Sequence, residues 1–206
     1  MSDEEALKIR VAELEEQLRQ SQREVRLTKL RRQVTPHFLF NSISVAVSLT
    51  IQSPETAVKF LRQVSKMYRY LLLYGNEYSV PVEQELEMVQ QYYELMSLRH
   101  VGSIRLDIDP QVKKLRKHPL PPLTLQGLLE NAIKHNAHTP ENPLIVRISR
   151  EDGCLLVANR MSPLASSNES THMGLAYMDE TMRLLFGCGI TVENSGDVFA
   201  VRLPLV

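Results

Sequence analysis

The sequence has no excess of charge of either sign, few cysteines and no long apolar run. Its 24 basic and 24 acidic side chains give a formal net charge of zero. This predicts no nucleic-acid or anionic-membrane partner, since either would favour a basic excess. The two cysteines, Cys154 and Cys188, lie far apart and indicate a reducing compartment without a cysteine-based metal or redox site. The apolar runs are too short to cross a bilayer. With 43% hydrophobic and 23% charged residues, the composition is typical of a soluble globular protein.

Residues 4–33 contain neither glycine nor proline and are rich in Glu, Arg, Gln and Leu. Apolar residues recur there in alternating steps of four and three, with Ser21 filling one gap: Leu7, Val11, Leu14, Leu18, Val25 and Thr28. This two-stripe pattern predicts a coiled coil of about four heptads. A single amphipathic helix is the alternative. The opening residues do not resemble a targeting sequence.

A helical hairpin is predicted after the coil. The apolar stripe continues through His37, and Pro36 removes a backbone donor, which predicts a kink beside the histidine. Ser53 and Pro54 mark a helix boundary, with Ser53 as the N-cap and Pro54 at the first helical position. The next helix, about 54–75, is expected to bury Val58, Leu61, Val64, Met67, Tyr68 and Leu71. Two such hairpins across a dimer would form a four-helix bundle.

The second half of the chain has the pattern of a mixed α+β domain with helices on one face of a sheet. Helices are predicted at 83–99, 123–136 and 174–186, and strands at 104–108, 144–150, 154–159, 190–193 and 198–203. The first of these helices is expected to bury Leu86, Val89, Tyr93 and Met96. We therefore predict three parts: a coiled coil at 1–32, a dimerising helical hairpin at 33–78, and an α/β sandwich at 79–206.

The helix at 123–136 combines an apolar face with a polar one. Its predicted buried face comprises Leu125, Leu128, Leu129 and Ala132, and the polar stripe comprises Asn131, Lys134, His135 and His138. Such side chains suit a polyphosphate and its metal, since Asn131 offers an oxygen to Mg²⁺ and Lys134 or His135 can neutralise phosphate charge. Glu130 could orient a water or take a proton. A solvated helix face explains the spacing equally well.

His37 alone indicates little chemistry. A single histidine at a helix edge is usually just a half-buried residue. The positions three and four residues later are Phe40 and Asn41, which do not complete a metal site. An unprotonated imidazole is nevertheless a nucleophile near neutral pH and can accept a phosphoryl group. The residues by themselves leave both interpretations open.

Two motifs together resemble a known family. The first is Gln33-Val34-Thr35-Pro36-His37-Phe38-Leu39-Phe40-Asn41, and it closely resembles the phosphoacceptor box of the LytS-like sensor histidine kinases. The second is Leu125-Gln126-Gly127-Leu128-Leu129-Glu130-Asn131-Ala132-Ile133-Lys134-His135-Asn136, which is similar to the N box of the GHKL ATPase fold. The helix around Glu85, Leu86, Tyr92 and Arg99 and the tail from Gly174-Leu175 are similar too. The resemblance covers nearly all of the chain after residue 30.

The resemblance implies an ATP-dependent protein-histidine kinase. His37, supported by Pro36 and Asn41, would receive the phosphoryl group from ATP held by a GHKL-type domain, and Glu130 and Asn131 would be catalytic. Mg²⁺ would lie on Asn131, and the ATP-binding residues would be Asn131, Lys134, His135, Asn159, Gly174 and Leu175. The family also implies a homodimer, a response-regulator receiver domain that takes the phosphoryl group onto an aspartate, and a cytoplasmic location as part of an inner-membrane receptor. A hinge is expected near 76–80.

The glycine boxes of the family are incomplete in this chain. The stretch 159–163 occupies the place of Asp-x-Gly-x-Gly, and Asn159 could accept a hydrogen bond from adenine through its amide oxygen, without charge assistance. The second box retains Gly174-Leu175, with Ser170 and His172 in place of the earlier glycines. These departures keep two alternatives open: a degenerate kinase that acts as a dimeric regulator-binding scaffold with weak or no ATP binding, and a GHKL serine kinase or ATPase.

Overall fold

The structure is a computed structural model that describes residues 17, 21, 35–162 and 173–205. For residues 35–41 and Met173 it describes the backbone alone. The chain divides into two compact units, Met1–Leu39 and Phe40–Val206. Most of the predicted coiled coil and of the irregular stretch at 161–172 therefore lies outside the described residues. The predicted domain boundary near residue 78 stays a prediction.

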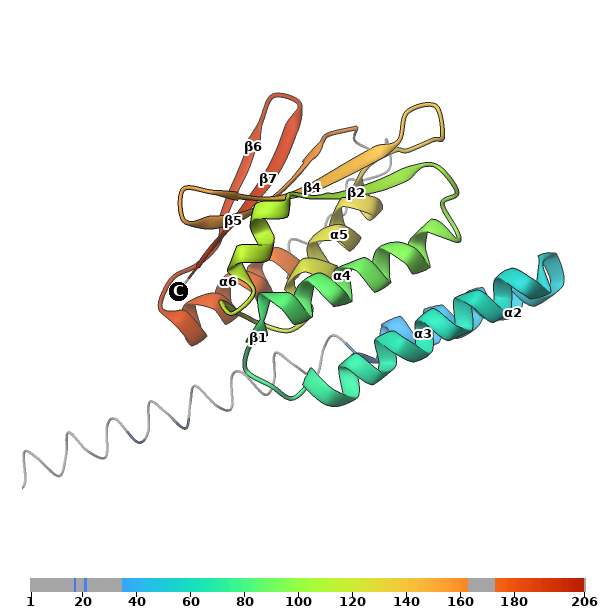
Figure 1. The fold of residues 1–206 in the computed structure, drawn as a ribbon, viewed down its shortest axis with the longest axis horizontal. Coiled ribbons are helices and arrows are strands. Elements are labelled where there is room, and N and C mark those ends of the chain that lie inside the picture. The colour runs from blue at the N-terminus through green and yellow to red at the C-terminus, as the bar shows by residue number, and fades with distance from the viewer. Residues whose placement is uncertain (1–16, 18–20, 22–34, 163–172, 206) are drawn as a thin grey trace, which may run out of the picture. The chain divides into compact units, whose positions relative to one another are not determined.

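Two helices begin the described chain, α2 (Thr35–Gln52) and α3 (Pro54–Tyr74) (Figure 1). Ser53 separates them and caps α3, because its side chain accepts a hydrogen bond from the Thr56 N–H at 3.4 Å. Pro54 occupies the first turn, where a backbone donor is not needed. The predicted boundary between the two helices is confirmed in both its residues.

The buried face of α3 differs from the predicted one. It comprises Ala57, Phe60, Val64, Met67 and Tyr70, so two of the six predicted residues, Val64 and Met67, are buried. By contrast, Val58, Leu61 and Tyr68 are exposed by 50%, 47% and 40%. The helix carries apolar residues on two faces, and periodicity cannot tell which of them meets the core of its own chain. The face that packs against α4 (Val82–Ser97) is the buried one.

Helix α4 follows the short strand β1 (Val80–Pro81) and packs against α3, α5 (Thr124–His135) and the sheet. Of its predicted inward residues, Val89 and Met96 are buried, whereas Leu86 and Tyr93 are only half-buried. The observed buried set is Val82, Glu85, Met88, Val89, Tyr92, Leu95 and Met96. The difference arises because α4 has neighbours on more than one side, which widens its buried face and includes an unexpected carboxylate.

A five-stranded mixed sheet forms the second layer, with the order β2-β4-β5-β7-β6. Its strands are β2 (Ile104–Ile108), β4 (Leu144–Glu151), β5 (Cys154–Arg160), β6 (Thr191–Ser195) and β7 (Val198–Pro204). The β2–β4 pair is parallel and the other pairs are antiparallel. A 3-10 helix, η1 (Pro110–Leu115), and β3 (Pro119–Leu120), which pairs with β1, lie between β2 and α5. The predicted mixed α+β fold is confirmed, with strand positions close to those expected.

Helices α4, α5 and α6 (Met173–Phe186) lie on one face of the sheet (Figure 1). The core between these layers combines sheet and helix residues, among them Val146, Ile148, Leu155, Val157, Leu203, Leu125, Leu129 and Met182. The sheet also carries surface ion pairs such as Arg147–Asp107 and Arg202 with Glu151 and Glu193. Among the described residues, no helix has both the length and the apolar character needed to cross a membrane.

Tight turns fix the register of the antiparallel strands. Glu151 pairs with Cys154, so Asp152 and Gly153 form the turn, both with positive φ (46° and 77°), as a two-residue hairpin turn requires. The last hairpin closes through Ser195 paired with Val198. Its turn is therefore shorter than the predicted four-residue turn at 194–197, although the hairpin itself is confirmed.

Candidate active site

Helix α5 carries the predicted polar stripe on a face that remains accessible. Its apolar side is buried as expected, with Leu125, Leu128, Leu129 and Ala132 in the core. Asn131 and His135 are half-buried, and Glu130 and Lys134 are exposed. Because the apolar residues hold the helix between α4 and the sheet, the polar side chains project from a rigid support. Such a face can meet a charged ligand without unpacking the core.

Asn131 and Gly174 lie close together although 43 residues separate them in the sequence. A Cβ built on Gly174 would stand 3.7 Å from Asn131 Nδ2 and 3.9 Å from Oδ1. Gly174 is in the first turn of α6, and the N–H groups at the start of a helix favour anions. The structure thus brings together two of the residues that the sequence placed at a nucleotide site, the amide of Asn131 and a helix N-terminus.

Glu130 belongs to a short polar chain that leads into the core. Gln126 Nε2 donates a hydrogen bond to Glu130 Oε2 at 2.6 Å, and Tyr92 is hydrogen-bonded to Gln126. Burial raises the pKa of Tyr92, and the negative charge of Glu130 raises it further, so the phenol stays neutral. One carboxylate oxygen of Glu130 is therefore held by Gln126, while the side chain as a whole is exposed. This arrangement suits a group that orients a water or accepts a proton.

Asn159 lies near the end of β5 and is buried. Its Nδ2 donates to the carbonyl of Arg160 at 2.8 Å. This bond uses one of the two N–H donors of the amide. Oδ1 is the acceptor through which the sequence predicts a hydrogen bond from an adenine amino group. The role itself stays a prediction.

Asn136 connects the end of α5 to the segment after β5, a function that sequence reasoning missed. Its Nδ2 donates to the carbonyl of Ala132 at 2.9 Å, and its Oδ1 accepts from the Ser162 N–H at 2.7 Å. The Ala137 N–H also donates to the carbonyl of Ser162 at 2.7 Å. The available signal was an asparagine at the end of a helical motif, because asparagine side chains commonly bond to backbone groups at helix ends.

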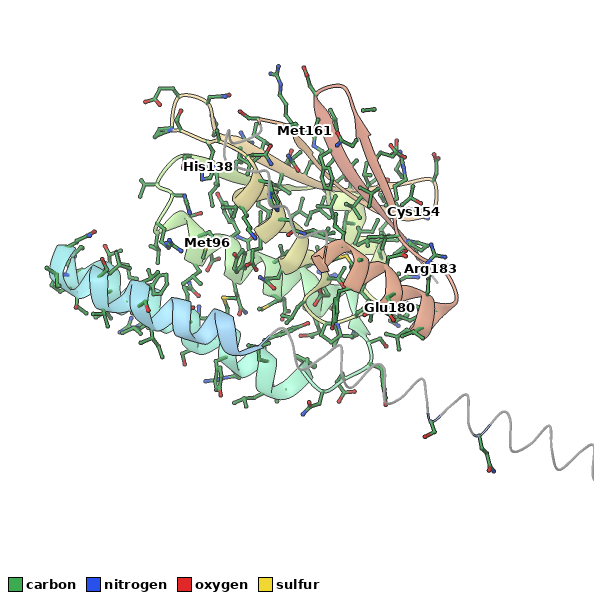
Figure 2. All side chains as sticks on the ribbon, turned by 180° about the vertical axis from the view of Figure 1, so that it is seen from behind. Met96, His138, Cys154, Met161, Glu180 and Arg183 are labelled. Carbon is green, nitrogen blue, oxygen red and sulfur yellow. The ribbon has the colours of Figure 1, made fainter. Side chains whose placement is uncertain are left out.

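His138 was expected on the same helical face as Asn131, and this expectation is wrong. Helix α5 ends at His135, and Asn136 already has an extended backbone. His138 Nδ1 lies 2.8 Å from the Asn136 carbonyl oxygen, and Nε2 lies 3.0 Å from His100 Nδ1. Burial lowers the pKa of His100, and His138 lowers it further. Figure 2 shows His138 and Met161 towards one end of the sheet and Cys154 at the other.

The remaining predicted residues are located only in part. His37, Pro36 and Asn41 lie on α2, so the predicted helical backbone at the histidine is confirmed. Their side chains are outside the description. Leu175 is half-buried in the first turn of α6, beside Gly174. Residues 163–172, which include Ser170 and His172, are not described.

Part of the chain matches a known protein family. Residues 25–104, which span His37 and helices α2 to α4, match the family model described as histidine kinase. Over these residues the chain is similar to histidine kinases. The chain is also similar to the sensor protein kinase HptS of Staphylococcus aureus, with 27% identity over 203 residues that cover 89% of this chain and 39% of the relative. It therefore spans less than half of the length of that curated relative.

Two solved structures with the name histidine kinase match the chain with low TM-scores. The Acinetobacter baumannii histidine kinase AdeS gives a TM-score of 0.39 with 15% identity, and the match covers 82% of this chain and 98% of that one. The catalytic domain of histidine kinase ThkA gives a TM-score of 0.40 with 15% identity, over 61% of this chain and 94% of that one.

Proposed function

We propose that this chain is the catalytic portion of a sensor histidine kinase that phosphorylates His37 from Mg-ATP and passes the phosphoryl group to an aspartate of a response-regulator receiver domain. The observation that carries the proposal is the approach of Gly174, at the start of α6, to the amide of Asn131 on the accessible face of α5. The family match over residues 25–104, which include His37, supports the proposed acceptor.

The donor set around Asn131 fits Mg-ATP. The Asn131 carboxamide offers the hard oxygen that Mg²⁺ prefers, and the bound ion would neutralise charge on the transferring phosphate. Lys134 and His135 follow on the same face and would contact the phosphates, as would the N–H groups at Gly174 and Leu175. Asn159 would accept a hydrogen bond from the adenine amino group. Phosphoryl transfer depends mainly on such positioning and charge stabilisation.

In the proposed reaction an unprotonated ring nitrogen of His37 forms a bond to the γ-phosphorus of ATP. The bond between that phosphorus and the β–γ bridging oxygen breaks, and ADP leaves with the electron pair. The proton on the other ring nitrogen is then lost to a base, for which Glu130 is the candidate. The predicted hinge near 76–80 would let the nucleotide site reach the histidine.

A homodimer is the proposed assembly, formed through the α2–α3 hairpin. Apolar side chains recur on exposed faces of both helices: Ile43, Val47 and Ile51 on α2, and Val58, Leu61, Tyr68 and Leu72 on α3. Their spacing of three, four or seven residues places those of each helix on one stripe, and such a stripe in water favours association. A second copy would bury both stripes in a four-helix bundle. From the likeness to a sensor protein kinase, we further propose that the parent protein is a membrane receptor.

The degenerate-scaffold alternative finds no support in the comparisons, because the relative is named a sensor protein kinase. The serine kinase or ATPase alternative leaves the match around His37 without a purpose. Both are nevertheless separable from the proposal by experiment, since they differ in whether nucleotide binds and in which residue becomes labelled.

The test is to incubate the protein with Mg²⁺ and γ-labelled ATP and examine the stability of the label. The proposal predicts a label that is lost in acid, survives base, and is absent from His37→Gln. His118→Gln, which removes an imidazole from outside the site, is the matched control and should label normally. A nucleotide at about 100 times its Kd should also stabilise the fold by roughly 2.7 kcal/mol.

Two results would contradict the proposal. Absence of label together with no nucleotide-dependent rise in Tm would favour a scaffold that does not bind ATP. An acid-stable label that persists in His37→Gln would favour a serine kinase.

A further inference from the structure

Glu85 is a carboxylate with no exposure to solvent. It lies in the first turn of α4, among the buried side chains Val82, Met88 and Val89. Removing a carboxylate from water is costly unless hydrogen bonds compensate the charge. The contacts of Glu85 should therefore be specific, and their arrangement indicates what the residue does.

Hydrogen bonds from Tyr70, Leu123 and Leu125 converge on the two oxygens of Glu85. The Tyr70 hydroxyl donates to Oε1 at 2.7 Å, the Leu123 N–H donates to Oε1 at 2.7 Å, and the Leu125 N–H donates to Oε2 at 2.8 Å. Burial raises the pKa of Glu85 to about 7, while the bonds from Tyr70 and from the N–H groups of Leu125, Leu123 and Thr124 oppose that rise. The carboxylate thus joins α3, α4 and the beginning of α5.

The N–H donors belong to the first turn of α5, which lacks a cap of its own. Its N-cap residue is Leu123, whose apolar side chain cannot accept a hydrogen bond and whose φ of 66° lies in the left-handed region. A non-glycine residue in that region is held there by its surroundings at some cost. Glu85 supplies from another helix the acceptor that Ser, Asp or Asn provides at an ordinary N-cap, and its negative charge suits the positive end of the helix.

The Tyr70 hydroxyl links α3 to the same carboxylate across residues 75–79, which join α3 to β1. A displacement of α3 that removed this donor would leave Oε1 with fewer hydrogen bonds in a buried place. The carboxylate would then take up a proton or shift, and in either case its hold on the Leu123 and Leu125 N–H groups would weaken. Because α5 is rigid, a change at its start moves the residues further along it.

We propose that Glu85 is a positioning residue that couples the helical hairpin to the nucleotide helix. Through Tyr70, Glu85 and the first turn of α5, the position of α3 controls the placement of Glu130, Asn131 and Lys134. The proposal rests on the proposed function, because it assigns the nucleotide to α5. It makes α3 a regulator of the nucleotide site as well as part of the hairpin.

The test compares Tyr70→Phe with Tyr74→Phe. Tyr74 lies one turn later on α3, its ring packs 5.0 Å from that of Tyr70, and its hydroxyl takes no part in the Glu85 hydrogen bonds. Two quantities are measured in each protein: hydrogen exchange of the Leu123 to Leu125 amides as a function of pH, and the Kd for Mg-ATP. Among the described residues, the titratable groups that face Glu85 are Tyr70 and, beyond it, Tyr74, while α5 presents backbone N–H groups.

Tyr70→Phe should speed exchange of these amides roughly tenfold near pH 7, the scale of one hydrogen bond to a charged group, and shift the pH at which protection is lost upward. It should also weaken Mg-ATP binding several-fold. Tyr74→Phe should leave both quantities at wild-type values. Unchanged exchange and unchanged affinity in Tyr70→Phe would overturn the proposal, and so would equal effects from the two substitutions.

The two arms separate this inference from the proposed function. If the wild-type protein binds no nucleotide, the proposed function fails, and the exchange arm still decides whether Tyr70 controls the start of α5. If Tyr70→Phe does not fold, the wild-type exchange profile decides. Protection of the Leu123 and Leu125 amides must then fall as the pH is lowered and Glu85 takes up a proton, and a profile without such a step overturns the role of Glu85.

Discussion

At the scale of single residues, Gly174 illustrates how an absent side chain can matter. Its φ is not positive, and an added Cβ would meet Asn131 at ordinary contact distance. Neither the backbone nor a clash therefore requires glycine here. What the residue provides is open space in front of the Asn131 amide, so the size of a substituted side chain should decide its effect.

Gly174→Ala and Gly174→Val test whether the size of the side chain at this position affects nucleotide binding. The alanine variant should bind Mg-ATP with nearly wild-type affinity, because its Cβ fits beside Asn131. Valine should weaken binding roughly tenfold, about 1.4 kcal/mol, because its branches cover the amide and β-branching lowers helix propensity in the first turn. Isothermal titration would measure both affinities, with melting curves to verify folding. Equal affinities for the two variants would contradict the assignment of Asn131 to the nucleotide site.

A second prediction at this scale concerns Glu85 and the dependence of the free energy of unfolding on pH. Burial raises its pKa from 4.5 to about 7, so between these values the folded protein retains a proton that the unfolded chain has released. Stability from this group therefore falls as the pH rises through that window and is constant above it. Glu85→Gln removes the dependence.

The free energy of unfolding of Glu85→Gln, relative to wild type, should increase by up to about 3 kcal/mol between pH 4.5 and 7. Urea unfolding at a series of pH values measures the difference. Glu87→Gln, which makes the same change at an exposed position on the same helix, is the control. A flat difference for Glu85→Gln would show that its carboxyl titrates as an ordinary one.

At the scale of elements, α5 depends on polar residues at both of its ends. Glu85 caps its beginning, and Asn136 fastens its end to Ser162. Each of these bonds joins segments far apart in the sequence. The position of the polar face is therefore set by tertiary hydrogen bonds as well as by apolar packing.

Asn136→Ala should destabilise the fold by about 1–3 kcal/mol, because it leaves the half-buried Ser162 N–H without its acceptor and removes the bond to Ala132. Thermal or urea unfolding would measure the loss. Asn142→Ala, which removes an exposed amide in the following loop, should have little effect. A loss below about 0.5 kcal/mol for Asn136→Ala, the range of ordinary surface substitutions, would show that the Asn136 hydrogen bonds contribute little to stability.

The elements were largely predictable from sequence, and the tertiary contacts were not. The strand at 104–108 and the cap at Ser53 follow from local signals, alternation and capping chemistry. Glu85 was overlooked because its partners lie 15 to 40 residues away. A signal was nevertheless present, since Glu85 falls on the same helical face as Val82 and Val89. The residues alone do not distinguish a phosphoryl acceptor at His37 from an ordinary half-buried histidine. The proposed acceptor role therefore rests on the family likeness.

At the scale of the whole molecule, the exposed stripes of α2 and α3 support the proposed homodimer. Periodicity misplaced the buried face of α3 because the helix has two apolar faces, only one of which meets its own core. A single sequence does not distinguish a core from an interface. This error is informative, because the predicted residues that proved exposed mark the surface a partner would cover.

Leu61→Glu should therefore dissociate the dimer. A charge in a bundle interface is costly, so the expected result is a shift of sedimentation coefficient from dimer to monomer. Ile145→Glu makes the same chemical change at an exposed position of β4 and should leave the dimer intact. A monomeric wild-type protein, or a dimeric Leu61→Glu variant, would contradict the proposed bundle.

The capping of α5 by Glu85, a residue of another helix, has a consequence for how the chain folds. The acceptor for the first N–H groups of α5 comes from a residue 38 to 40 positions earlier. The segment 124–135 therefore lacks, within itself, the cap for its first helical turn. It should form late, after α4 has docked, and a synthetic peptide of this segment should be mostly unstructured in water. Grafting the segment onto another scaffold would thus require a buried acid in the host at the position that Glu85 occupies here.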